Sequence, residues 1–147
     1  EGWSAYFNFL TGKSADTGGT GTVLDLTTAY QITEKFKLGL NAADYTLTNN
    51  LGGYSGVALY PQYAFTKAFA LGLRGEYFQS KDATIDGVAA EGQSVTALTV
   101  SANIKAGNLT VIPEIRFDNS SAENFFKENG NPTKSASQFL IGAVYSF

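Results

Sequence analysis

The chain has 147 residues, the length of one domain, and contains no histidine, cysteine or methionine. These absences exclude Ser–His and Cys–His nucleophile pairs, disulfides, and zinc, haem or iron–sulfur sites with histidine or cysteine ligands. The net charge of −3 arises from 10 basic and 13 acidic residues scattered along the chain, so we expect a protein that is not an enzyme, holds no cofactor or metal, and has no nucleic-acid partner.

The composition favours a β-sheet in unusual surroundings. Apolar residues make up 44% of the chain and charged residues only 16%, whereas a soluble domain has about 25% charged residues. No apolar run approaches the roughly 18 residues of a membrane-spanning helix, and no leader peptide opens the chain. The first residue is Glu1, so we expect a mature or excised segment.

In chain order, apolar residues alternate with polar or small residues in eight stretches, which predicts eight strands. They lie at about 3–10, 22–31, 36–45, 54–65, 69–79, 93–105, 109–118 and 137–147. The connections alternate between short turns and long polar loops. The short turns are 32–35, 66–68 and 106–108, and the long loops are 11–21, 46–53, 80–92 and 119–136. This pattern predicts one up-and-down antiparallel domain over 1–147, with short and long connections at opposite ends.

An internal repeat connects two of the predicted hairpins. Six residues recur at an interval of 33: Tyr30, Thr33, Phe36, Leu38, Gly39 and Leu40 correspond to Tyr63, Thr66, Phe69, Leu71, Gly72 and Leu73. The repeated unit is one hairpin around a short turn. We expect either a barrel that grew by hairpin duplication or two turns that converged on the same chemistry.

Each predicted strand has one row of large apolar residues and one row of small or polar residues. In the strand at 69–79, Phe69, Leu71, Leu73 and Tyr77 oppose Ala70, Gly72, Arg74 and Glu76. A soluble lipocalin-like barrel would turn the bulky row inward around an apolar ligand. A transmembrane barrel would turn this row to lipid and hold the small and charged residues in its lumen.

Three observations favour the transmembrane barrel. The polar row is rich in glycine and alanine, which fit a narrow interior. It also carries opposite charges that can pair inside a lumen, and we expect this lining to include Arg74, Glu76, Glu114, Arg116 and Asp118. Aromatic residues recur eight positions apart on the bulky row, about 26 Å along a strand, as membrane girdles require. The predicted girdle consists of Tyr30, Phe36, Tyr63, Phe65, Phe69, Tyr77, Phe117, Phe139 and Phe147.

Three residues fit this pattern poorly. Asp44 falls on the bulky row, which is tolerable because it lies near the long-loop end of its strand. Pro61 and Pro113 fall inside predicted strands and remove ladder donors, so we expect a bulge or a local break beside each.

Four segments carry a family resemblance. They are LGLNAADY (38–45), FALGLRGEYF (69–78), the run VTALTVSANIKAGNLTVIPEIRFDNSSAENFF (95–126) and the ending SQFLIGAVYSF (137–147). With them the chain resembles the OmpL-like porins, bacterial outer-membrane β-barrels of Bacteroidota, over nearly its whole length. In this resemblance, Tyr145 and Phe147 look like the C-terminal signal read by the barrel-assembly machinery. The implied surroundings are the lipid bilayer of the bacterial outer membrane.

Members of that family are longer, with more strands before the matching part. The chain would therefore be a small relative, the C-terminal part of a larger barrel, or an excised or engineered form with fewer strands. Eight strands enclose a lumen filled by side chains, so we expect a monomeric eight-stranded transmembrane barrel of porin ancestry with at most narrow passive conductance of ions or small solutes. The alternatives are a soluble small-ligand binding barrel and a surface adhesion or assembly protein that uses its long loops.

Overall fold

The computed structural model describes residues 2–13 and 18–147, and the described residues form only strands, turns and loops. Eight strands are long. They are β1 (Trp3–Lys13), β2 (Thr20–Gln31), β3 (Phe36–Leu47), β4 (Gly53–Ala64), β5 (Phe69–Ser80), β8 (Ser94–Ala106), β9 (Leu109–Ser120) and β12 (Ser135–Tyr145). Each coincides with one predicted strand to within three residues at either end. Among the described residues, no helix is long and apolar enough to cross a membrane.

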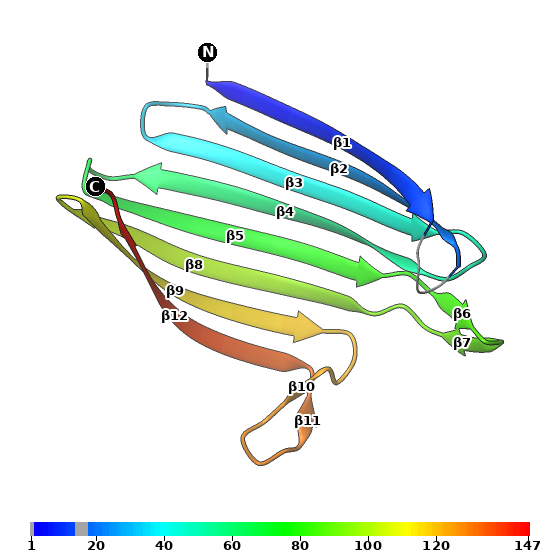
Figure 1. Ribbon diagram of the computed structural model, residues 1–147. Helices are drawn as coiled ribbons and strands as arrows, with labels where there is room; N and C mark the ends of the chain where they lie inside the picture. Colours follow the sequence, from blue (N-terminus) through cyan, green and yellow to red (C-terminus); the bar gives the residue numbers. More distant parts are fainter. Residues whose placement is uncertain (1, 14–17) are drawn as a thin grey trace.

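The eight long strands form one strongly curved antiparallel sheet in the order β1-β2-β3-β4-β5-β8-β9-β12 (Figure 1). Each long strand pairs with the long strand that comes next in the chain, which confirms the predicted meander. The short turns lie at one end of the sheet and the long connections at the other (Figure 1). The expected loop at 11–21 includes residues 14–17, which lie outside the described part of the chain.

Two of the predicted long loops contain short strands that the alternation pattern missed. The connection at 80–92 holds the hairpin of β6 (Ala83–Ile85) and β7 (Val88–Ala90). The connection at 119–136 holds β10 (Phe125–Phe126) and β11 (Pro132–Thr133). Strands of two or three residues are too short for a period of two to be recognised in sequence.

The expectation of a closed eight-stranded barrel was wrong in two respects. The described residues form twelve strands, and among them β1 and β12 pair only on one side, so the sheet is open. A physical reason lies on the polar row, which also carries the bulky side chains of Tyr6, Tyr45, Tyr60 and Phe78. An eight-stranded lumen has room only for a compact filling of side chains, and these rings favour a wider arc.

The register is constant along all seven ladders of the sheet, despite two internal prolines. Pairing of β4 with β5 stops at Leu59–Gly75 and resumes at Gln62–Gly72. Beside Pro113, pairing of β8 with β9 stops at Ser101–Glu114 and resumes at Ile104–Val111. Each gap contains equal numbers of residues on both strands, so each proline makes a local break without a bulge. The missing proline N–H accounts for both gaps.

The 33-residue repeat produces two turns with the same hydrogen bonds. In the first turn, Thr33 N donates to Phe36 O at 3.2 Å and Ile32 N donates to the same oxygen at 2.9 Å. In the second, Thr66 N and Phe65 N donate to Phe69 O at 3.2 and 3.0 Å. The threonine hydroxyl oxygen also accepts a backbone N–H in each turn, a local bond that stabilises tight turns.

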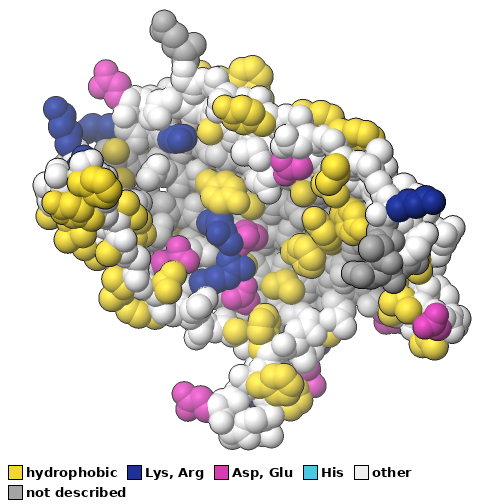
Figure 2. Space-filling model, in the orientation of Figure 1, with side chains coloured by type: hydrophobic (Ala, Val, Ile, Leu, Met, Phe, Trp, Pro, Cys, Tyr) yellow, Lys and Arg dark blue, Asp and Glu magenta, His cyan; other side chains and the backbone are white. Residues whose placement is uncertain are grey.

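Few side chains are buried in this sheet. Among the described residues, only Ala58 and Ala97 form a buried apolar core, and Thr99 and Ser120 are the buried polar residues. Large apolar side chains of the bulky row lie on the convex face and are widely exposed, including Leu59, Leu73 and Phe117. The other face is hollowed, with basic and acidic side chains gathered at its centre (Figure 2). The charged side chains therefore gather on the hollowed face, which also exposes some large side chains, such as Leu10, Phe78 and Leu140.

Candidate functional site: the concave face of the sheet

Four charged residues form a continuous network on the concave face. Arg74 Nη2 donates to Glu76 Oε2 at 2.7 Å. Arg116 Nη1 bonds the same Glu76 oxygen, while Arg116 Nε and Nη2 reach the Asp118 carboxylate at 3.0 and 2.8 Å. The Glu76, Arg116 and Asp118 side chains are 14–24% exposed and Arg74 is 39% exposed, so the pairs of Arg116 are the better shielded from water. Their attraction is therefore screened less than that of a surface pair.

The network crosses from β5 to β9 because β8 has small side chains between them. Glu76 lies opposite Ala97, which lies opposite Asp118, and Arg74 lies opposite Thr99, which lies opposite Arg116. Ala97 and Thr99 are 9% and 3% exposed, covered by the charged side chains above them. The sequence predicted pairing across a lumen, but the observed pairs run along the wall of one sheet.

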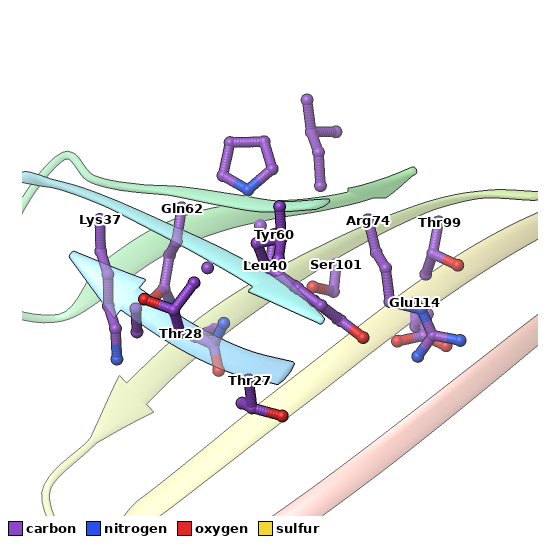
Figure 3. Close-up of a pocket in the computed structure, with 16 residues that line it drawn as sticks. Thr27, Thr28, Lys37, Leu40, Tyr60, Gln62, Arg74, Thr99, Ser101 and Glu114 are labelled. Carbon is purple, nitrogen blue, oxygen red and sulfur yellow. The ribbon is translucent and has the colours of Figure 1, made fainter. Parts of the chain in front are cut away.

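Glu114, the remaining predicted lumenal residue, takes part in no ion pair among the described residues. It lies opposite Ser101 on β8 and lines a hollow of about 430 Å³. Figure 3 shows Arg74, Thr99 and Glu114 at one end of this hollow and Lys37 and Gln62 at the other. The hollow therefore presents groups of both charges to its interior.

A second polar cluster, which the sequence reasoning missed, joins the first three strands on the same face. Asn8 Nδ2 donates to Asp25 Oδ1 at 2.9 Å, and Asn41 Nδ2 donates to Asp25 Oδ2 at 2.8 Å. Asn8 is directly opposite Asp25 in the ladder. The available signal was the alternation in these strands, which places all three residues on the polar row.

The family comparison agrees with this arrangement of a two-faced antiparallel sheet. A family model described as "Putative beta-barrel porin-2, OmpL-like" matches residues 1–147, the whole chain. The chain belongs to this porin family. A search of the curated proteins found no match.

In this member of the porin family, the residues predicted as an aromatic girdle lie on the convex face or at its ends. Tyr63 and Phe65 have ring centroids 4.9 Å apart, and Phe65 and Phe69 are 5.6 Å apart, at the short-turn end. Tyr77 is 42%, Phe117 48% and Phe139 66% exposed. Tyr145 ends β12, and Phe147 follows it, fully exposed. Tyr30 and Phe36 also belong to the bulky row.

The porin's one acidic misfit on the convex row has a partner at the long-loop end. Lys81 Nζ lies 2.7 Å from Asp44 Oδ2 and donates to Thr46 Oγ1 at 2.5 Å. The two charged side chains are 32% and 46% exposed. Lys81 follows directly after β5, so the pair fastens the start of the β6–β7 extension to the end of β3.

Proposed function

We propose that the sheet forms part of the wall of a β-barrel in the bacterial outer membrane, and that its concave face lines a passive conduit for ions or small solutes. The observation that carries this proposal is the division between the faces. Large apolar side chains are exposed on the convex face, while the concave face holds the Arg74–Glu76–Arg116–Asp118 network. A lipid-facing exterior and a polar interior are the two requirements of a transmembrane barrel.

The aromatic residues and the last strand support the same location. Tyr63, Phe65 and Phe69 cluster at the short-turn end of the convex face, where a girdle would meet the lipid headgroups. The C-terminal strand, with Tyr145 and Phe147, would be read by the barrel-assembly machinery. Porin ancestry supports a role that is not enzymatic.

The open sheet removes the limit that eight strands would set on the width of the conduit. The expectation of a narrow lumen assumed that eight strands close into a barrel, and the described sheet is not closed. In hydrocarbon, unpaired N–H and C=O groups cost several kcal/mol each, so we expect both sheet edges to be paired in the membrane. The expected monomeric state stays a prediction, which light scattering of the detergent-solubilised protein tests.

The decisive experiment measures ion selectivity in planar bilayers. Glu114→Lys reverses a charge that lines the hollow without breaking an ion pair among the described residues, so it should shift the reversal potential in a salt gradient towards anion selectivity. Glu34→Lys, in an exposed short turn, makes the same charge change outside the concave face and should leave the potential unchanged. Conductance with equal selectivity in wild type and Glu114→Lys would refute the lumenal assignment.

Two alternative functions make different predictions. A soluble lipocalin-like module would stay dispersed without detergent, whereas a membrane barrel needs detergent or lipid and migrates heat-modifiably on a gel. The exposed apolar convex face favours the second behaviour. An adhesion protein would bind its partner through the connections at 80–92 and 119–136, and deletion of the β6–β7 or β10–β11 hairpin would abolish that binding.

A further inference from the structure

Three aromatic rings lie side by side on the concave face, near the long-loop end. The ring centroids of Tyr45 and Tyr54 are 5.4 Å apart, and those of Tyr54 and Phe78 are 5.7 Å apart with 29° between the ring planes. The three residues come from β3, β4 and β5, and they share a face with Glu76. They belong to the polar row, so they are not part of the girdle on the other face.

A glycine on a neighbouring strand makes room for one of these rings. A Cβ on Gly21 would lie 2.8 Å from the Tyr45 ring, whereas one on Gly56 would make an ordinary contact of 3.6 Å with the Phe78 ring. The Tyr45 ring therefore covers the backbone of Gly21. Tyr54 and Phe78 remain 37% and 44% exposed, so ring surface is presented to the concavity.

Fixed polar groups border the rings. Asn41, Tyr60 and Glu76 line a hollow of about 190 Å³ together with Tyr54 and Phe78. Glu76 is held by both Arg74 and Arg116, and Asn41 by Asp25 and Thr27. A ligand placed on the rings would therefore meet hydrogen-bonding groups that are already oriented, which limits the entropy lost on binding.

This combination selects one class of ligand by its chemistry. A pyranose ring has an apolar C–H face that packs on an aromatic ring and hydroxyls at its edge that bond carboxylates and amides. An acyl chain would leave the bordering polar groups unpaired. An organic cation would gain little from Glu76, whose charge is already balanced by two arginines.

We propose that Tyr45, Tyr54 and Phe78 form a stacking platform for a neutral oligosaccharide. The proposal rests on the proposed function in one respect, because the concave face must be reached by solutes. The adjoining rings extend across three strands, so the platform would contact more than one sugar unit of a linear chain.

The test is titration calorimetry with maltohexaose on the full chain in a detergent without a sugar headgroup. Phe78→Ala removes one stacking surface and should weaken binding about two- to tenfold, as loss of one aromatic contact does. Phe117→Ala is the matched control, because it removes a ring of similar exposure from the convex face on β9, and Phe117 does not line this hollow. Its affinity should equal that of wild type.

A second variant acts on the platform without removing a ring. Gly21→Ala places a methyl group against the far end of the Tyr45 side chain, which must tilt away, and binding should again weaken. No measurable binding to wild type, or equal losses in Phe117→Ala and Phe78→Ala, would overturn the platform. Calorimetry needs no bilayer, so binding without conductance would refute the conduit alone, and conductance without binding would refute the platform alone.

Discussion

The guanidinium of Arg116 on β9 reaches across β8 to the carboxylate of Glu76 on β5. The same guanidinium holds Asp118 on its own strand at 2.8 Å, and its Nη1 donates to Thr99 Oγ1 on β8 at 3.4 Å. One side chain thus ties together three adjacent strands of a sheet that has almost no apolar core among its described residues. Polar contacts along the wall take over part of the role that side-chain packing has in a soluble domain.

Replacement of this arginine should destabilise the sheet. Arg116→Leu leaves Asp118 without its partner and Glu76 with Arg74 alone, and we expect a loss of about 1–3 kcal/mol in free energy of unfolding, between the values for exposed and buried pairs. Urea unfolding of the refolded protein in lipid vesicles measures it. Lys67→Ala, in an exposed turn, serves as the control. A midpoint for Arg116→Leu equal to that of the control would contradict a stabilising role.

The small side chains of β8 should resist enlargement on one face only. Ala97→Leu inserts bulk beneath the Glu76–Arg116 bridge at a position that is 9% exposed, and overpacking of this kind costs about 1–3 kcal/mol. Leu98→Phe enlarges the next residue, which is 49% exposed on the convex face, and should be tolerated. Unfolding midpoints of the two variants provide the comparison, and equal sensitivity would count against the bridge.

The Lys81–Asp44 pair should contribute weakly, as partly exposed pairs do. Lys81→Ala is expected to lower stability by less than about 1 kcal/mol, and Asp44→Ala combined with Lys81→Ala should recover that loss because no unpaired charge remains. A double-mutant cycle measured in vesicles separates the pair from its surroundings. If the double variant were less stable than Lys81→Ala, the pairing would not be the source of the effect.

The membrane assignment predicts a difference between the two faces of the sheet. Leu73→Arg puts a charge on the convex face, where an arginine near the bilayer midplane costs about 2–4 kcal/mol. Ser101→Arg puts the same charge on the concave face and should have a small effect. Unfolding from vesicles measures both variants. Equal stabilities would argue that the convex face does not contact lipid.

The sequence could predict the eight long strands because a period of two is a strong signal over ten or more residues. It also placed Arg74, Glu76 and Arg116 on one row. It could not predict whether the outer edges of the first and last strands pair, since alternation describes each strand and its faces but carries no measure of sheet curvature.

The platform aromatics were missed for a different reason. The rows assigned to the strands of Leu38, Val57 and Leu73 already place Tyr45, Tyr54 and Phe78 opposite the bulky residues. Glycines, alanines and charged residues dominate the polar row, so composition alone does not single out the large rings among them. Their clustering also depends on register between strands, which follows from the turns and not from any one strand.

Among the described residues, the outer edges of β1 and β12 are unpaired, and this has a consequence for how copies of this chain meet in solution. Both strands have 11 residues and run in opposite directions, so β12 of one copy can extend the ladder of β1 of another, since an exposed edge is a template for strand addition. Such contacts join unlike surfaces and leave a fresh edge after every addition, and their growth stops only when a ring closes. Dilution and early addition of lipid during refolding should therefore raise the yield of discrete particles and lower that of fibrous aggregates.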